Sequence, residues 1–430
     1  MNVDHLLQLQ QPLKEGGIRS VNFFNGRLLT SKDLTREQVA RRESDSRVGL
    51  GIGDGVAFGL EAARDPQRDT PAAPVLRIKA GLAINRLGQT LRLTGDISVA
   101  LTRKFAASAG SGDCDCVFAK CDPIADGVYV AGAGVYVLTI APSSAAEGRA
   151  PTNGLDPLNV RCNTDANVEA LQFRLLSLTQ TMLAGLDLGS DSLRNELAYR
   201  CFGSGIQSSW FESLLTAPPR VDDLLEALRK TGLGEQEVPL ALLYFRGASQ
   251  LVFVDVWAVR RPLHRPETGA LAALVESRPL AAGHAMFMQF QSQIAQLGAP
   301  VVLPGSVTAR SHFRYLPPVG VIPVPEESNA IDAEATRFFA GLIYRGPAFI
   351  NGARLEGLVR ESLCCPPIDT QSGEFVWLYR VRENREAIDL KSTTPLPRSY
   401  LVFASGHLPY RADSHFDTAH WNYSNYALAR

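Results

Sequence analysis

Alternating hydrophobic and polar residues mark several segments of the chain as β-strands. The alternation is clearest at residues 75–79 (VLRIK) and 91–93 (LRL), with a turn at 85–89 (NRLGQ) between them. A period of two places successive side chains on opposite faces of a strand. Together with the run GVAFGLEA that begins at Gly55, this pattern predicts a small antiparallel β domain over residues 55–105.

The N-terminal segment follows a different pattern. Residues 18–29 (IRSVNFFNGRLL) predict a short strand and then a tight turn, because Asn25-Gly26 readily supplies the positive φ that such a turn needs. The tight turn therefore fixes where the next element begins.

A helix is predicted to follow from about Ser31, with Ser31 or Thr30 as its N-cap. Residues 36–47 (REQVARRESDSR) are almost wholly charged or polar, so little apolar surface holds this helix to its own domain. The helix is therefore either solvated or packed against a partner subunit through its polar side chains. We interpret residues 1–54 as a strand-turn-helix docking segment.

Residues 106–298 mix helical and strand patterns and are expected to form a central α+β domain. Two apolar runs within residues 239–260 predict a pair of buried strands. Helices are predicted at 190–201, 221–231 and 271–297, the last interrupted near Pro279 and Gly283.

The apolar run that contains Trp257 is expected to place this large ring on a buried strand. Arg260 and Arg261 follow it at the basic end of the run. Their guanidinium groups are expected to pair with acidic groups, either within the domain or across an interface.

The last part of the chain, residues 299–430, is expected to form a β-rich domain with an aromatic tail. Its four prolines exclude a helix over residues 313–325 (FRYLPPVGVIPVP). Strands are predicted at 338–349, 374–381 and 400–405, with a short helix at 355–363.

Chain length agrees with several domains. A chain of 430 residues exceeds the size at which one hydrophobic core stops growing. Hydrophobic residues make up 45% and charged residues 20%, a composition that supports globular domains. We therefore predict a multi-domain α+β fold of mostly antiparallel β domains, with a polar N-terminal helix and a helical middle section.

Charge and hydropathy narrow the class of partner. The 43 basic and 44 acidic residues leave a net charge of −1, which gives no electrostatic reason to expect nucleic acid or an anionic membrane as partner. No window approaches the roughly 18 apolar residues of a membrane span. The N-terminus lacks the basic and apolar regions of a secretory signal, and the cysteines are odd in number, so synthesis in a reducing cytoplasm is expected.

Motifs of common enzymes are missing from the sequence. It contains no GxxxxGK phosphate loop followed by Ser or Thr, no GxSxG nucleophile elbow and no HExxH zinc motif. The glycine-rich stretches at 49–53 and 132–134 do not complete GxGxxG between a strand and a helix. We therefore expect a protein that is not an enzyme.

Cys114, Cys116 and Cys121 form the first candidate site. With Cys162 further along the chain, they supply the four soft ligands that a tetrahedral structural zinc site requires. The Cys-x-Cys spacing differs from the common Cys-x2-Cys pair, so two alternatives stay open: a disulfide formed after release from the cell, and thiols that remain free. No other cofactor is expected.

His407, Asp413, His415, Asp417 and His420 form the second candidate site. The alternation of the middle three would place them on one face of a strand, where they could bind a metal. The alternative is a polar loop held by the aromatic residues that surround it.

Four segments, taken in order, resemble structural proteins of phage-tail-like contractile injection systems. They are residues 22–38 (NFFNGRLLTSKDLTREQ), 81–88 (GLAINRLG), 313–324 (FRYLPPVGVIPV) and 366–384 (PPIDTQSGEFVWLYRVREN). The chain departs from that group at 51–60 (GIGDGVAFGL), where the group often carries a tryptophan-containing GWGVVxGL run.

The resemblance implies a structural component at the baseplate or at the fibre and cage periphery, with no catalytic residues. It implies partners among the baseplate, fibre or sheath-proximal subunits, a multimeric state within the particle, and a final location in that particle, inside the cell or released from it. Two other functions stay open: a module that binds a surface glycan or receptor, and a metal-dependent hydrolase that uses the His407 to His420 group.

Overall fold

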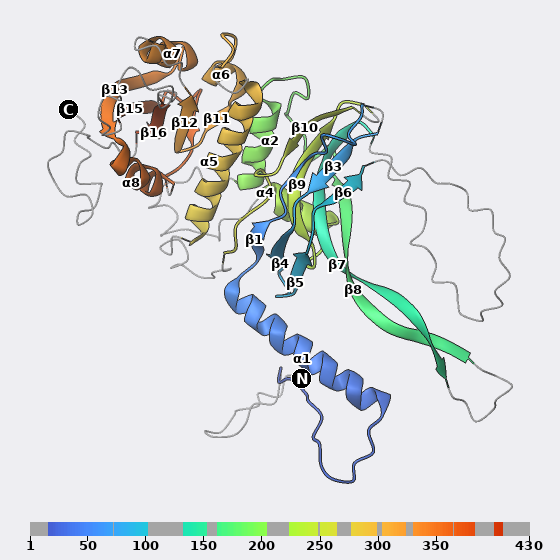
Figure 1. Ribbon diagram of the computed structural model, residues 1–430. Coiled ribbons are helices and arrows are strands. Elements are labelled where there is room, and N and C mark those ends of the chain that lie inside the picture. Colours follow the sequence, from blue (N-terminus) through green and yellow to red (C-terminus); the bar gives the residue numbers. More distant parts are fainter. Residues whose placement is uncertain are drawn as a thin grey trace, which may run out of the picture.

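The computed structural model has a multi-domain α+β fold in which helices cover mostly antiparallel sheets (Figure 1). It describes residues 16–71, 73–101, 132–152, 161–203, 223–247, 250–264, 277–298, 303–323, 330–363, 365–382 and 400–406. The fold class predicted from the hydrophobic pattern is confirmed.

The polar N-terminal helix is followed by two small antiparallel sheets. The helix is α1 (Ser31–Ile52). One sheet has the order β1-β4-β5 and the other β2-β3-β6. Their strands are β1 (Gly55–Gly59), β2 (Ala62–Arg64), β3 (Val75–Ile78), β4 (Gly81–Ile84), β5 (Thr90–Leu93) and β6 (Ile97–Ala100). The alternation therefore predicted the strands of this region and their antiparallel pairing correctly.

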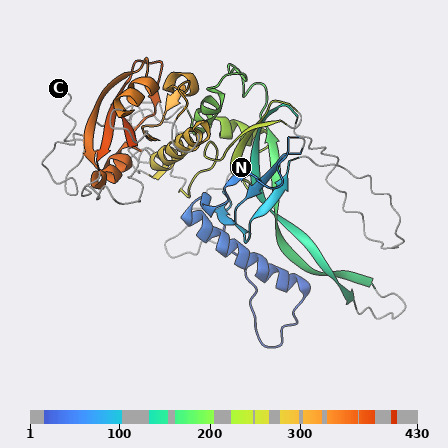
Figure 2. The ribbon, with the colours of Figure 1, turned by 45° about the horizontal axis from the view of Figure 1, so that its top comes forward.

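The central sheet has the order β10-β9-β7-β8, and all its pairings are antiparallel. Its strands are β7 (Gly134–Thr152), β8 (Arg161–Ser177), β9 (Val238–Phe245) and β10 (Leu251–Asp255). Only the first part of β7, up to Ile140, also pairs with β9. Beyond that point, β7 and β8 pair with no further strand of the described residues and form a long ribbon that leaves the body of the protein (Figure 2).

All eight residues of β9 are buried, because cores lie on both of its faces. On one face, Leu242 and Tyr244 pack with α2 (Leu193–Phe202) and α4 (Asp223–Thr231). On the other face, Leu243 and Phe245 pack with the two small sheets. A strand buried on both sides reads as a continuous apolar run, which is the pattern of residues 238–245.

The next helix, α5 (Ser277–Leu297), is continuous, so the predicted interruption is wrong within these residues. Pro279 lies in the first turn, where its missing N–H would have had no helical partner. Gly283 lies where a Cβ would come within 1.9 Å of the carbonyl oxygen of Leu363. The glycine therefore serves close packing against a later segment and does not break the helix.

The C-terminal sheet has the order β12-β16-β15-β13. Its strands are β12 (Val319–Pro323), β13 (Ile343–Asn351), β15 (Phe375–Arg382) and β16 (Tyr400–Ser405), and the helices near it are α6 (Ala309–His312), α7 (Ala330–Phe338) and α8 (Gly352–Ser362). β13 and β15 pair in parallel, an exception to the antiparallel rule. The strand predicted from residue 338 begins only at Ile343, because Phe338 ends α7 with its ring fully buried.

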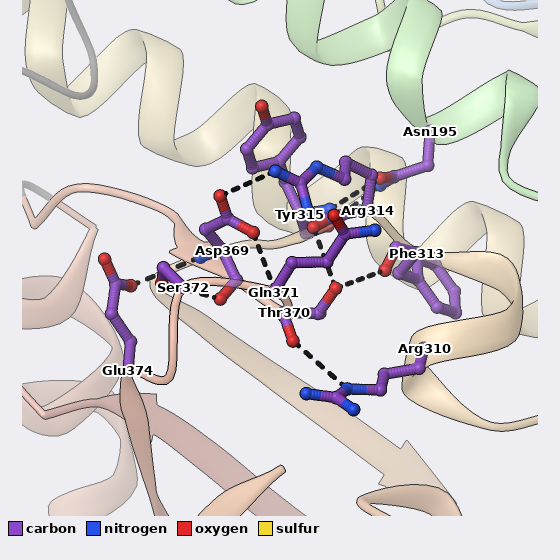
Figure 3. A network of polar contacts seen from close by, with 10 residues as sticks. All are labelled: Asn195, Arg310, Phe313, Arg314, Tyr315, Asp369, Thr370, Gln371, Ser372 and Glu374. Atoms are coloured by element: carbon purple, nitrogen blue, oxygen red, sulfur yellow. Dashed lines mark hydrogen bonds and ion pairs between the residues drawn. The ribbon is translucent and has the colours of Figure 1, made fainter. Parts of the chain in front are cut away.

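A polar joint ties α2 to the C-terminal part of the chain (Figure 3). The side-chain amide of Asn195 donates to the carbonyl oxygen of Tyr315 at 2.9 Å, and its oxygen accepts from the N–H of Tyr315 at 2.9 Å. Tyr315 belongs to β11 (Tyr315–Leu316), which pairs with β14 (Ile368–Asp369). Arg314 and Asp369 add an ion pair of 2.9 Å. The polar groups of this joint bond to each other, which is the arrangement of a structural contact.

A buried ion pair lies beside this joint. The Nε of Arg194 is 2.6 Å from Oδ2 of Asp255, and both side chains are buried. The same carboxylate accepts from Gln289 of α5 at 3.0 Å and from the N–H of Ala258 at 3.0 Å. A buried charge needs such partners, so the Asp255 carboxylate links α2, β10 and α5.

Trp257 lies in a turn after β10 and not on a strand, so that expectation is wrong. The guanidinium of Arg260 stacks 4.7 Å from the ring centroid of Trp257 and lies 3.6 Å from the carboxylate of Glu61. Arg261 donates to backbone carbonyls, among them that of Cys201. Arg260 therefore pairs with an acidic group within this chain, which was one of the two expected alternatives.

Replacing Arg194 by alanine should destabilise the protein strongly, because Asp255 would keep a buried charge without its cation. The expected loss in the free energy of unfolding is about 3–5 kcal/mol. Urea unfolding measures it. Arg77→Ala is the matched control, because its pair with Asp96 is 50% and 39% exposed and should contribute less than about 1 kcal/mol. Equal losses in the two variants would contradict this role for the buried pair.

Candidate interaction surface: the N-terminal arm

The two site predictions made from the sequence fall largely outside the described residues. Cys114, Cys116 and Cys121 lie outside them, as does the group from His407 to His420. Cys162 belongs to β8, but its side chain is not described. In the described part of the chain, no group of three or more His, Cys, Asp or Glu side chains is arranged to hold a metal ion. The zinc site and its alternatives therefore stay predictions.

Residues 16–52 form the best candidate for an interaction surface in the described structure. We call it the arm, and we call its first part, residues 16–30, the strap. Figure 1 shows α1 leaving the body of the protein and the strap turning back along it. None of the helices in the described ranges is long and apolar enough to cross a membrane.

The arm helix begins where its cap predicts. Thr30 is the N-cap, one of the two residues expected, and its hydroxyl accepts from the N–H of Asp33 at 3.3 Å. The carboxylate of Asp33 accepts in return from the N–H of Thr30 at 3.0 Å. This reciprocal capping box satisfies backbone groups that the helix start would leave unpaired.

The turn before the helix is fixed by Gly26 and Arg27. Gly26 has a φ of +88°, as the Asn-Gly pair predicted, but the short strand predicted before the turn is wrong, because residues 17–24 form no regular structure. Arg27 then lies 2.6 Å from the carboxylate of Asp33, so the turn and the helix start are tied together.

These contacts hold the pKa of Asp33 at about 2, below its ordinary value of 3.8. The hydrogen bond from the Thr30 hydroxyl is the largest cause, followed by the Thr30 backbone bond, with Arg27 as a smaller contribution. Because the folded pKa is the lower one, the ionised carboxylate stabilises the folded arm above pH 3.8. That stabilisation is lost as the pH falls toward about 2.

Two hydrogen bonds hold the strap against α1. The N–H of Val21 donates to the carboxylate of Glu37 at 3.2 Å, and Arg47 donates to the carbonyl oxygen of Gly16 at 2.5 Å. Val21 and Ala40 are the buried apolar side chains of the arm. The strap and the helix therefore form one unit with a very small core of its own.

The far end of α1 is anchored by contact between two glycines. A Cβ on Gly49 would lie 2.0 Å from the carbonyl oxygen of Gly88, and a Cβ on Gly88 would lie 1.9 Å from the carbonyl oxygen of Ser46. Gly88 also has a φ of +76°, in the turn predicted at residues 85–89. The helix backbone therefore rests directly on the turn between β4 and β5.

The tip of the arm exposes large apolar side chains. Leu28 is 89% exposed and Phe24 is 62% exposed, far above what a folded core would leave. We call the following set the apolar tip: Phe23, Phe24, Leu28, Leu29 and Leu34. Large apolar side chains that gather exposed on one short segment are typical of interaction sites. The polar helix led us to interpret this segment as a docking element, whereas the exposure of the FF and LL pairs on either side of the turn was not predicted.

A groove of about 530 Å³ lies between the strap and α1. Arg19 of the strap lines it, together with Lys32, Arg36, Val39 and Glu43, which follow each other in that order along α1. The helix side of the groove therefore carries its basic residues toward the tip and its acidic residue toward the body.

The pKa of Asp33 tests the capping box. Thr30→Ala removes its largest cause, so the pKa of Asp33 should rise from about 2 toward 3.8. Carboxyl carbon NMR of aspartate-labelled protein measures the titration. Ser31→Ala is the control, because Ser31 does not cap the helix and should leave the pKa of Asp33 unchanged. An unchanged pKa in Thr30→Ala would contradict this assignment.

Gly49→Ala should loosen the arm from the body, because the added methyl group meets the backbone of Gly88 and neither backbone can move cheaply. Gly51→Ala is the matched control in the same helix, since a Cβ there meets nothing within 4 Å. It should leave the arm attached and stabilise α1 by about 0.5–1 kcal/mol. Amide hydrogen exchange over residues 31–52 distinguishes the two. Equal protection in both variants would show that the glycine contact does not anchor the helix.

Comparisons with known proteins identify no family. No family model matches the chain, and no curated protein matches it. Among solved structures, the crystal structure of TssK is similar over 65% of this chain and 51% of that chain, with 10% sequence identity and a TM-score of 0.26. This chain therefore spans about half the length of that protein. At this identity and TM-score the likeness assigns neither a family nor a function.

Proposed function

We propose that this protein is a non-enzymatic structural component of a contractile, phage-tail-like injection particle. It sits at the baseplate or at the fibre and cage periphery, as one of several copies, and acts through protein–protein contacts. The arm carries the main contact. The observation that carries the proposal is the apolar tip, which the protein holds in a defined position and leaves uncovered.

The construction of the arm supports a docking role. Its capping box, its ion pair and its glycine anchor fix the position of the tip, so the arm is ordered before any partner binds. An ordered surface loses less conformational entropy on association than a flexible one. Its own core is very small, so the exposed apolar residues serve association better than folding.

The ribbon of β7 and β8 supports the same role. Among the strands that the structure describes, the outer part of β7 pairs only with β8, and the side chains of residues 144–148 and 164–169 are exposed. A two-stranded ribbon without a core behind it is marginally stable alone. Contact with neighbouring subunits would stabilise it, as expected of a protein that works inside an assembly.

The sequence resemblance indicates which kind of assembly the protein belongs to. One of the four segments that resemble contractile-injection proteins, residues 22–38, contains the whole apolar tip and the capping box. Part of the resemblance therefore falls on the exposed surface of the arm. A docking segment shared among related subunits would have that property.

Replacing Phe24 and Leu28 together by aspartate should abolish incorporation into particles and leave the fold intact. Both side chains are mostly exposed, so their loss removes little burial from the free protein. Co-sedimentation with the sheath-and-tube particle measures incorporation, and thermal unfolding checks the fold.

Ile343→Asp is the matched control for the double variant. Ile343 is 58% exposed on an edge strand of the C-terminal sheet, far from the arm. This variant should co-sediment like the unaltered protein. Normal incorporation of the Phe24 and Leu28 double variant would overturn the docking role, and a protein never found with particles would overturn the proposed function.

A further inference from the structure

α5 is shared between two cores of the protein. Ala285 and Met286 pack into the core that contains α2 and α4, whereas Phe290 and Ile294 pack into the core of the C-terminal sheet. Figure 1 shows the helix between these two parts of the fold. A contact that holds α5 in place therefore bears on both cores.

His284 is the only ionisable residue between positions 279 and 297 of this helix. Its half-buried ring packs edge-to-face with Trp257, with ring centroids 5.7 Å apart. Its Nδ1 atom is buried and has no hydrogen-bond partner among the described residues. A neutral imidazole can leave this atom without a proton, because the other ring nitrogen then carries it.

A permanent cation lies on the same indole ring. The guanidinium of Arg260 is 4.7 Å from the ring centroid of Trp257 and donates to the carbonyl oxygen of Gly59 at 2.6 Å. Its acidic partner, Glu61, is 3.6 Å away and 37% exposed, so it balances the charge only in part. We call the contact of His284, Trp257 and Arg260 the latch. It joins α5 to the segment between β1 and β2.

The elements around α5 offer His284 no counter-ion. α2 and β12 pack against the helix, and the end of α8 meets it at Gly283. β12 has no charged residue. The charged residues of α2, of β10 and of the last turn of α8 are Arg194, Glu196, Arg200, Asp255, Arg360 and Glu361. No ion pair within the described ranges includes His284.

We propose that protonation of His284 opens the latch and separates α5 from the turn that carries Trp257. The protonated ring would hold a buried N–H at Nδ1 without an acceptor, which costs free energy. It would also place a second positive charge beside Arg260. Both effects disfavour the closed contact. Because Arg260 also bonds to Gly59, opening would loosen the tie between α5 and the small sheets.

The direction of the pH dependence follows from the pKa of His284. Burial is the largest cause that lowers this pKa below its ordinary value of 6.5, and Arg260 is the second. Because the folded pKa is the lower one, the stabilisation from the latch is complete above pH 6.5 and is lost as the pH falls through the folded pKa. The latch is therefore closed at neutral pH and opens in acid. This inference is independent of the function proposed above.

Amide hydrogen exchange of the full chain at about pH 7.5 and about pH 5.5, corrected for the intrinsic exchange rates, tests the proposal. Protection of residues 277–290 should fall severalfold at the lower pH. His284→Phe keeps a ring against Trp257 but cannot be protonated, so it should abolish this fall. Arg260→Gln removes the neighbouring cation, so the pKa of His284 should rise, as NMR of histidine-labelled protein would measure.

His264→Phe is the matched control. Nδ1 of His264 lies 3.3 Å from the carbonyl oxygen of Pro262, so its proton has an acceptor, and the variant should keep the pH dependence of the unaltered protein. The same fall in protection in His284→Phe would overturn the proposal. So would a pKa of His284 at or above 6.5 in the unaltered chain, a measurement that decides the matter even if His284→Phe does not fold.

Discussion

Burial of β9 on both faces is the constraint on which the arm and the central part of the described structure depend. One face of this strand carries the core shared with α2 and α4, and the other carries the core shared with the two small sheets. Neither core can form without the strand, because its side chains alternate between them. Helices and small sheets, distant in the sequence, are therefore held in fixed relation by one apolar segment.

The position of the arm follows from that strand. The segment just before β9 bonds to the turn at residues 85–89: the side-chain amide of Asn85 donates to the carbonyl oxygen of Gln236 at 3.1 Å, and the N–H of Arg86 donates to that of Glu235 at 3.2 Å. Gly88 of the same turn supports α1 through backbone contact. The buried strand thus fixes the position of the turn, and the turn fixes the position of the helix. This continuity allows an almost wholly polar helix to project from the body with its apolar tip uncovered.

Local patterns predicted the elements well where short-range physics decides them. Alternation over 75–79 and 91–93 gave the small antiparallel strands, Asn25-Gly26 gave the turn, and Thr30 was one of two expected caps. Contacts between distant segments decided what the sequence could not predict. Gly283 looked like a helix breaker until its contact with Leu363 was known, and the parallel pairing of β13 with β15 has no local signature. The groove depends on the strap folding back along α1, so its lining by residues of both segments could not be read from spacing.

Imaging of the assembled particle, at a resolution that traces this chain, tests the docking role most directly. We expect the arm, residues 16–52, in contact with neighbouring subunits, with the rings and methyl groups of Phe23, Phe24 and Leu28 covered by apolar side chains of a partner. A particle in which this arm points into solvent, with its contacts made through other surfaces, would contradict the docking role of the N-terminal segment.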